Sequence, residues 1–194
     1  MRRFPTTLSA LAILAFLLAN TAAPRQAAAT SALAYTVEEM ARLSAAVVIG
    51  TVGPDRLERH PVYLRPVTVT TLRIERVLAG SAPTSLELRQ WKGTLDGRTT
   101  AIAGDPDLER GQRSLFFLRQ VNGQWFLTAL SQALFIMGPE SDPRLHRRVD
   151  IALYATNPDG TLRPVPDAPD APTTLSAMEA TLAGVALKGP EVTE

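Results

Sequence analysis

The sequence predicts a mainly β protein, a small barrel with a short helix before it and another after it. Three observations predict this fold. Between residues 47 and 137, short apolar runs are separated by Gly, Pro and Asp, which is the spacing of strands and turns. The long run at 67–77 changes its apolar face midway. Asn122-Gly123 joins two apolar runs and is the strongest hairpin signal in the chain.

Residues 1–29 have the three-part layout of a secretory signal peptide. Arg2-Arg3 precedes an apolar run at 8–19, and small residues lead to Ala27-Ala28-Ala29. The apolar run has 12 residues, whereas a bilayer-spanning helix needs roughly 20. We therefore expect Sec export, with a twin-arginine signal as the alternative, and cleavage before Thr30. The expected product is periplasmic or extracellular and has no integral membrane segment.

The folded region is expected to begin with a helix over about 37–43. Thr36-Val37-Glu38-Glu39 is a capping box, in which Thr36 and Glu39 satisfy each other's backbone N–H groups. The stretch VVIGTVG at 47–53 follows. A phosphate-binding glycine loop needs a helix directly after it, but Pro54 and a polar loop to residue 66 follow instead. We interpret the stretch as a core strand in which Gly50 permits a bend or a close approach.

The next strands are expected at residues 67–77, 86–91, 115–118, 125–130 and 134–137. Val67 and Val69 share one face of their strand, whereas Leu72 and Ile74 share the other, so a β-bulge is expected near Thr70-Thr71. Such a bulge bends a long strand enough to serve both halves of a closed barrel.

The remainder of the chain predicts an added hairpin, a linker and a helix. The turn signal at 157–160 joins apolar runs at 149–154 and 162–165. Residues 164–172 contain alternating prolines and are expected to form an extended linker. A helix is expected within 173–187, capped by Thr173 or Thr174, and its apolar stripe favours docking onto the barrel over binding a partner. The barrel domain itself is expected to span residues 35–163.

Composition excludes several classes of function. Without residues 1–29 the chain has 17 basic and 19 acidic residues, so its charge gives no reason to expect nucleic-acid binding. The chain contains no cysteine, which excludes disulfides, thiol catalysis, zinc-cysteine sites and lipid attachment at an N-terminal cysteine. The 165 residues that remain after cleavage suffice for one sizeable core.

No motif predicts a catalytic or metal site. His60 and His146 are interpreted as surface residues, because they lie in separate polar segments without a His-Glu-x-x-His pattern. Ser114 and Ser131 lack a Gly-x-Ser-x-Gly elbow and are interpreted as strand or turn residues.

The acidic stretch at 105–109 offers oxygen ligands for calcium but lacks the order of the known calcium loop. Pro106 and Asp107 are therefore expected to form a turn. No cofactor or metal is expected.

Aromatic and basic residues around 89–98 allow two interpretations. Trp91, Arg89 and Lys92 lie beside glycines and suggest an exposed rim of the kind that binds oligonucleotides. Alternatively, Trp91 is the last core residue of its strand. We favour the core interpretation, because export argues against a nucleic-acid ligand.

The order of elements resembles that of the netrin-like module and the tissue inhibitors of metalloproteinases. The resemblance covers residues 35–137, and it is carried by the segments at 45–52, 69–80, 86–89 and 108–118 and by the Asn122-Gly123 hairpin. Small exported bacterial proteins have a similar pattern. The resemblance implies a five-stranded oligonucleotide/oligosaccharide-binding (OB) barrel. The inhibitors chelate zinc through an N-terminal cysteine, which this chain lacks, so no functional residue is carried over.

The sequence therefore predicts an exported, non-enzymatic binding module for a protein partner or an extracellular ligand. Barrels of this kind present one face and its loops to ligands. We expect the site in the loop at 53–66 and the segment at 91–107. The alternative is a protease-inhibitor-like protein or a hydrolase that uses loop residues such as His60, Asp105 and Asp107. An enzyme is expected to gather such groups in one pocket with perturbed pKa values.

Overall fold

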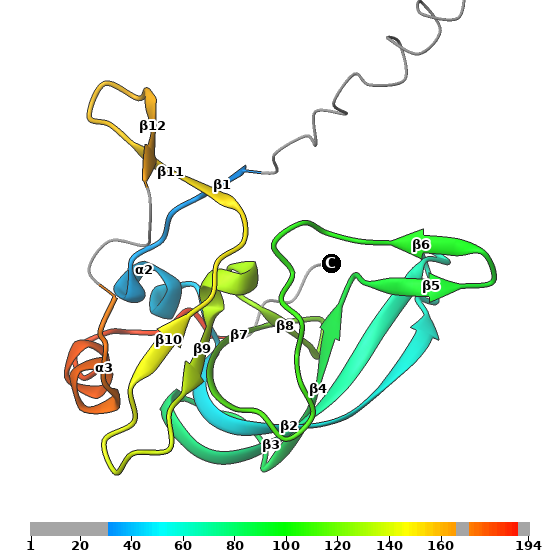
Figure 1. The fold of residues 1–194 in the computed structure, drawn as a ribbon, viewed down its shortest axis with the longest axis horizontal. Coiled ribbons are helices and arrows are strands. Elements are labelled where there is room, and N and C mark those ends of the chain that lie inside the picture. Colours follow the sequence, from blue (N-terminus) through cyan, green and yellow to red (C-terminus); the bar gives the residue numbers. More distant parts are fainter. Residues whose placement is uncertain (1–30, 166–170, 190–194) are drawn as a thin grey trace, which may run out of the picture.

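The computed structural model describes residues 31–165 and 171–189, so the predicted signal peptide at 1–29 lies outside the described residues (Figure 1). The elements are, in chain order, β1 (Ser31–Leu33), α2 (Val37–Arg42), β2 (Ala46–Arg59), β3 (Pro66–Gly80), β4 (Ser85–Gln90), β5 (Gly93–Leu95), β6 (Arg98–Thr100), β7 (Arg113–Val121), β8 (Gln124–Leu127), the 3-10 helix η1 (Leu130–Ala133), β9 (Leu134–Met137), β10 (Leu145–Arg147), β11 (Ala152–Thr156), β12 (Leu162–Val165) and α3 (Leu175–Leu182). The predicted mainly β fold is confirmed.

Seven strands form one sheet in the order β10-β9-β7-β2-β3-β4-β8. Strand β8 also pairs with β7, so β7, β2, β3, β4 and β8 form a ring of paired strands. All neighbours in the ring are antiparallel except β4 and β8, which run parallel and meet at Leu88 and Trp125. Pairing around a ring satisfies strand edges that an open sheet leaves free.

The hairpin predicted at Asn122-Gly123 is confirmed. It connects β7 to β8, and Val121 pairs with Gln124 across the two-residue turn. Asn122 has φ +49° and Gly123 has φ +76°, the left-handed conformations that this short turn demands. The local dipeptide therefore fixed the register of the strand that completes the ring.

The long loop predicted at 53–66 is wrong, because β2 continues to Arg59 and only residues 60–65 form the turn to β3. Pro54 does not end the strand because it lies in a β-bulge. Val52 pairs with Leu72 and Asp55 pairs with Thr70, so Gly53 and Pro54 together face Thr71. A bulge tolerates proline because its residues need not donate to the ladder.

The bulge predicted in β3 at Thr70-Thr71 occurs at that level of the ladder, but the extra residue belongs to β2. Strand β3 has two bulges of its own nearer its end, opposite the Val47/Val48 and Ile49/Gly50 steps of β2. The predicted change of apolar face is real, since Val69 and Leu72 are both fully buried. Only Leu72 of these two belongs to the main core cluster.

The stretch at 47–53 is the core strand that the sequence predicts, and no helix follows Gly53. Val47, Val48, Ile49 and Val52 are all at most 2% exposed. Gly50 provides a close approach between strands, because a Cβ atom there would lie 2.9 Å from the carbonyl oxygen of Arg73. That distance is too short for a carbon atom, so the ladder requires glycine here.

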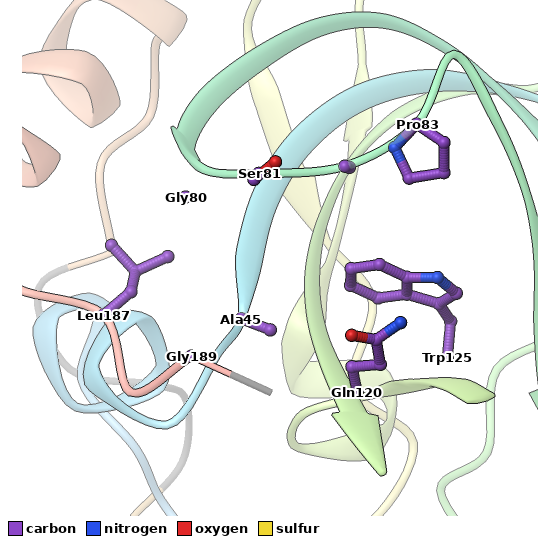
Figure 2. A pocket seen from close by; sticks show the side chains of 9 residues that line it. Ala45, Gly80, Ser81, Pro83, Gln120, Trp125, Leu187 and Gly189 are labelled. Carbon is purple, nitrogen blue, oxygen red and sulfur yellow. The ribbon is translucent and has the colours of Figure 1, made fainter. Parts of the chain in front are cut away.

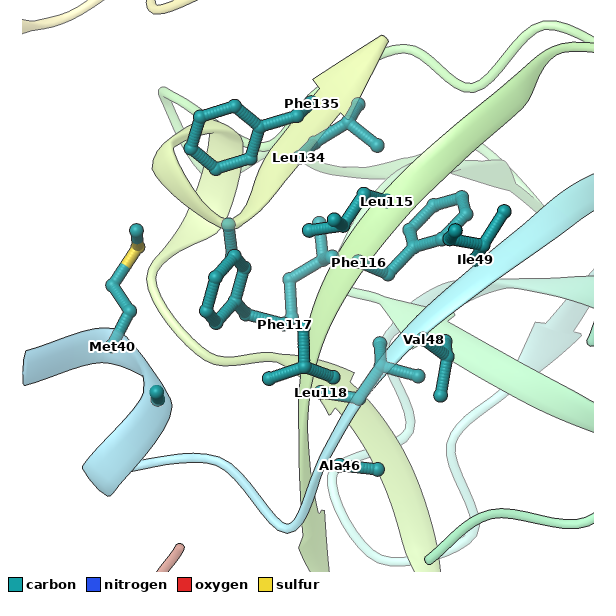
Figure 3. Packing of buried hydrophobic residues seen from close by; sticks show 14 of the residues in the cluster. Met40, Ala46, Val48, Ile49, Leu115, Phe116, Phe117, Leu118, Leu134 and Phe135 are labelled. Atoms are coloured by element: carbon teal, nitrogen blue, oxygen red, sulfur yellow. The ribbon is translucent and has the colours of Figure 1, made fainter. Parts of the chain in front are cut away.

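The main core lies on both sides of β7. Figure 3 shows the rings of Phe116 and Phe117 pointing to opposite sides of the strand, with Phe117 directed toward Met40 of α2. All three side chains are fully buried. Phe117 also packs against Phe135 of β9, with ring centroids 5.9 Å apart. Because the strand is covered on both faces, its buried residues form a continuous run instead of alternating.

Both predicted helices are present. The capping box is confirmed, since Glu39 N–H donates to Thr36 Oγ1 at 3.2 Å and Thr36 N–H donates to Glu39 Oε2 at 2.8 Å. Helix α3 is shorter than the predicted 173–187 and is capped by Thr174. Its Met178 and Leu182 are buried in the main core, which confirms the predicted docking. No helix in residues 31–165 and 171–189 is long and apolar enough to cross a membrane.

A separate three-stranded sheet has the order β1-β11-β12. It contains the hairpin predicted at 149–165 and a small apolar cluster of its own around Leu153 and Val165. The predicted linker at 164–172 begins too early, because Pro164 and Val165 pair within this sheet. The linker residues 166–170 lie outside the described residues.

Candidate functional site: an aromatic and cationic surface beside the β2–β3 turn

Large apolar side chains gather at one end of the β2–β3 hairpin. Val62 is 74% exposed, Tyr63 is 63% exposed and Leu64 is 50% exposed, all in the turn between the strands. Ile102, from the segment after β6, is 41% exposed. We call the β2–β3 turn (60–65), Trp91 and residues 98–102 the tip surface. A contiguous exposed apolar patch is uncommon on a monomer and marks interaction sites.

Three aromatic rings organise the turn. The ring centroid of His60 lies 4.8 Å from that of Trp91 and 5.0 Å from that of Tyr63. Tyr63 meets Trp91 edge-on, with ring centroids 5.6 Å apart. The Nδ1 atom of His60 accepts the backbone N–H groups of Val62 and Tyr63, each at 3.3 Å. His60 therefore ties the turn together, and Trp91, which lies just after β4, packs against it.

The β5–β6 hairpin lies beside this turn (Figure 1). Asp96 and Gly97 connect the strands with φ values of +50° and +73°, as a two-residue hairpin turn requires. Arg59 at the end of β2 forms an ion pair with Asp96. This hairpin was not predicted from the sequence, although Asp96-Gly97 is a recognised hairpin signal, because its strands have only three residues each.

Two adjoining pockets run along the tip surface, with volumes of about 490 Å³ and 530 Å³. Both are lined by Tyr63, Arg65, Thr100 and Ala101, so we describe them as one trough. Arg98 lines one end and Trp91 lines the other. Residues from both segments in which the sequence predicts the site, 53–66 and 91–107, thus line the trough together.

Among the described residues, the arginines that line the trough lack the ion pairs that neighbouring arginines form. Along β2 and β4, Arg56 pairs with Glu58 at 2.6 Å and Arg89 pairs with the same carboxylate at 3.3 Å. The hydrogen bond from Arg56 is the main reason that the pKa of Glu58 is lowered. Arg65 and Arg98, in contrast, have no carboxylate partner within residues 31–165 and 171–189. The trough is therefore a site of uncompensated positive charge beside aromatic rings.

The structure corrects the favoured interpretation of Trp91. The side chain is half-buried, lies just after β4 and packs against His60 and Tyr63 outside the main core. The rim interpretation describes its position better. Tyr63 and Arg65 were not singled out by the sequence analysis. A signal was available, since Val62-Tyr63-Leu64 is an apolar run enclosed by Pro61 and Pro66.

Asp105 and Asp107 lie near the end of β4. Asp105 accepts a hydrogen bond from Gln90 Nε2 at 2.9 Å, and burial raises its pKa. Asp107 pairs with Lys92, and the hydrogen bond from that ammonium group lowers its pKa. His60 lies instead in the aromatic cluster. Within the described residues, no three His, Cys, Asp or Glu side chains are placed to hold a metal ion.

The turn predicted at Pro106-Asp107 is wrong. The chain turns earlier, where the N–H of Asp105 donates to the carbonyl of Ile102 at 3.1 Å. Gly104 has φ +82°, which glycine adopts most readily, so the turn forms there. Pro106 is buried, and its carbonyl accepts a hydrogen bond from Gln90 Nε2 at 2.9 Å.

The other predicted site residues lie apart from the tip surface. His146 is exposed on β10, as expected, and Ser114 is buried on β7, where its Oγ accepts from Gln112 Nε2 at 2.9 Å. Ser131 is buried in η1 and not in a strand or turn. Its hydroxyl has no hydrogen-bond partner among the described residues, and the residue lines a small pocket of about 100 Å³.

A further pocket of about 490 Å³ lies at the opposite end of the β2–β3 ladder, beside Ala45 and Gly80 (Figure 2). Figure 2 shows Trp125 and Gln120 on one side of this pocket and Leu187 on the other. It lacks the unpaired guanidinium groups of the trough. The tip surface is therefore the stronger candidate site.

No protein-family model matches the chain, and a comparison with curated proteins finds no significant similarity. The function of the chain therefore has to be inferred from its geometry and charge.

Proposed function

We propose that this chain is an exported, non-enzymatic binding module that engages a protein partner or an extracellular ligand through its tip surface. The observation that carries the proposal is the exposed cluster of Val62, Tyr63 and Leu64 beside Trp91. Large aromatic and aliphatic side chains lose unfavourable contact with water when a partner covers them. Tyrosine, tryptophan and arginine are also the residues that most often dominate binding energy at interfaces.

The order of the strands in the ring supports the OB-like barrel that the sequence implies, and this fold commonly serves binding. When the ring strands β2, β3, β4, β7 and β8 are numbered one to five, their order around the ring is 1-2-3-5-4. The third and fifth strands are the parallel pair. This connectivity supports the proposal of a five-stranded Greek-key OB barrel, a fold whose loops and one face bind ligands. It agrees with the netrin-like resemblance, and export is supported by the layout of residues 1–29.

The β2–β3 turn of the tip surface is held together by backbone hydrogen bonds and ring contacts. The turn is held by hydrogen bonds from His60 N–H to the Arg65 carbonyl at 2.8 Å and from Leu64 N–H to the His60 carbonyl at 2.9 Å. The aromatic contacts with Trp91 add further support. A surface that is ordered before binding loses less conformational entropy when the partner arrives.

Photo-crosslinking tests the proposal. Tyr63 is replaced by p-benzoyl-phenylalanine in the native cell, and illumination is expected to give a discrete covalent adduct. The matched control carries the same group at Leu162, which is 58% exposed on β12 outside the tip surface. Adducts at both positions in equal yield, or at neither position, would reject the tip surface as the binding site.

A further inference from the structure

We propose that the trough binds an extended acidic peptide segment, which adds as a third strand along the free edge of β6. This inference rests on the proposed binding function and specifies its ligand. Within the described residues, β6 pairs only with β5, in a sheet of two strands. An open strand edge is a template for a further strand, and extended peptides bind many domains in this way.

The register of the hairpin identifies the backbone groups that face outward. Leu95 and Arg98 flank the two-residue turn and form a hydrogen-bonded pair, so the next pair, Thr94 and Thr99, is not hydrogen-bonded. The N–H and C=O groups of Thr99 therefore point away from β5. Figure 1 shows the hairpin beside the ends of β2 and β3, with β6 as its outer strand.

The lining of the trough agrees with an exposed strand edge. The four consecutive residues from Arg98 to Ala101 all border the same pocket. Side chains of a strand alternate between its two faces, so an unbroken run of lining residues indicates that the edge itself borders the pocket. Tyr63, Arg65 and Pro66, from the turn and the start of β3, border the same pocket. A strand added to the outer edge of β6 would therefore run past these residues.

Charge selects an acidic segment. Arg65 and Arg98 both line the trough and have no carboxylate partner among the described residues. A guanidinium group binds a carboxylate through two parallel hydrogen bonds. The rings of Tyr63 and Trp91 offer contacts for apolar side chains at the other end. A peptide of alternating acidic and apolar residues carries both kinds of side chain along its whole length, so it can satisfy both ends of the trough.

The observations favour a peptide over single-stranded nucleic acid, which also binds aromatic and basic surfaces. A nucleic acid carries a charge on every nucleotide and needs a track of cations along its path. Around the trough, such a track is interrupted by carboxylates, since Arg59 pairs with Asp96 and Lys92 pairs with Asp107. Two uncompensated guanidinium groups match a short acidic segment better than a polyanion.

Binding to defined fluorescent peptides tests the inference. The probe is a hexapeptide of alternating aspartate and apolar residues, blocked at both ends and titrated with the purified full chain by fluorescence anisotropy. There are two comparison probes. One is the same peptide with lysine in place of aspartate, and the other is an oligo-dT of fifteen nucleotides. The aspartate peptide is expected to bind at least tenfold more tightly than the lysine peptide. Equal binding of these two peptides, no binding of the aspartate peptide, or tighter binding of oligo-dT would overturn the inference.

Two methylated probes test strand addition itself. One carries backbone N-methyl groups on its odd residues and the other on its even residues. A strand directs alternate N–H groups to opposite sides, so only one of the two probes is expected to lose binding. Equal effects of the two methylation patterns would show that the peptide does not bind as a strand.

Charge-reversal variants test the residues. Arg65→Glu and Arg98→Glu are each expected to weaken binding of the aspartate peptide about tenfold, since each replaces an attraction with a repulsion. The matched control is Arg163→Glu, on the exposed face of β12, which is expected to leave binding unchanged. An equal loss in all three variants would contradict a specific role of the trough. If Tyr63 gives a specific photo-adduct and the aspartate peptide does not bind, the proposed function stands and this inference falls.

Discussion

The Glu75 carboxylate accepts a hydrogen bond from Nε of Arg113 at 2.8 Å, which joins two strands that do not pair with each other. Glu75 lies on β3 and Arg113 on β7, with β2 between them. Thr51 of β2 donates to the same carboxylate at 2.5 Å. Glu75 is the extra residue of a bulge, because its neighbours Ile74 and Arg76 pair with successive residues of β2. The bulge thus links three neighbouring strands of the ring.

Replacing Glu75 with glutamine tests this link through its pH dependence. The hydrogen bonds from Thr51 and Arg113 lower the pKa of Glu75 in the folded chain. A lowered folded pKa contributes stability above the ordinary glutamate pKa of 4.5, and the contribution is lost as the pH falls through the lowered value. At pH 7 we expect Glu75→Gln to reduce the free energy of unfolding by about 0.5 kcal/mol, because the pair is partly exposed.

The measurement is urea denaturation of both proteins at pH 7 and at about pH 2. The difference between them is expected to disappear at the lower pH. Glu109→Gln is the control, since Glu109 is exposed and has no ion pair within the described residues. A difference that is the same at both pH values would contradict a role for the Glu75 charge.

Substituting Gly50 tests the close approach of β2 and β3. The Cβ atom of Gly50→Ala would lie 2.9 Å from the Arg73 carbonyl oxygen, a backbone atom that cannot move alone. We expect the free energy of unfolding to fall by about 1–3 kcal/mol, as for other overpacked sites. Gly184→Ala is the matched control, because a Cβ atom there meets nothing within 4 Å. Thermal denaturation of both variants distinguishes local crowding from a general effect of removing glycine.

A stabilising change is expected at Asp105. Burial raises the pKa of this carboxyl group, so the folded chain disfavours its charged form. A raised carboxyl pKa makes stability decrease as the pH rises from the ordinary value of 3.8 through the folded value. Asp105→Asn keeps an oxygen for Gln90 and removes the charge. We expect the variant to gain stability at pH 7, by about 1 kcal/mol, and to match the natural chain at about pH 3.

Asp107→Asn provides the contrast to Asp105→Asn. Its ion pair with Lys92 lowers the pKa of Asp107, so this variant is expected to lose stability, if only slightly, at pH 7. Urea denaturation at the two pH values measures both effects. A loss of stability at pH 7 in Asp105→Asn would show that the charge of Asp105 stabilises the fold.

The buried hydroxyl of Ser131 gives a further prediction. Its Oγ has no hydrogen-bond partner among the described residues, and the residue is 1% exposed. Removing an unsatisfied buried polar group relieves its desolvation cost, so Ser131→Ala is expected to raise the free energy of unfolding by about 1 kcal/mol. Ser44→Ala is expected to lower it by a similar amount, because Ser44 Oγ bonds to the Met40 carbonyl and to Thr128 Oγ1, each at 2.7 Å. Equal effects of the two variants would refute this distinction.

Features that depend only on residues adjacent in the chain were predictable from the sequence. The capping box at Thr36 and Glu39 and the turn at Asn122-Gly123 form because a few adjacent residues satisfy their own backbone groups. The same holds for the core strand at 47–52. The end of β2 was not predictable in this way, since Pro54 normally interrupts a strand. Only the facing strand, with Thr71 opposite Gly53 and Pro54, shows that a bulge accommodates it.

The candidate site was predictable as two segments of the chain but not as a surface. The local sequence left two positions open for Trp91, an exposed rim and the end of a core strand, and an apolar residue at a strand end commonly stays buried. Its position depends on contacts with His60 and Tyr63, about 30 residues earlier in the chain. The charge state of the trough is also a tertiary property, since the carboxylate partner of each arginine depends on strand pairing.

The sequence by itself determined the mainly β fold, the presence of both helices, the capping box at Thr36 and the turn at Asn122-Gly123, because these follow from local hydrogen bonding and apolar periodicity. The tertiary structure alone decided which strands close the ring, where β2 bends, and which cations stay unpaired. The reason is physical. Residues far apart in the sequence, such as the paired Leu88 and Trp125, or Arg65 and Arg98 in the lining of one trough, are brought together by the packing of distant segments.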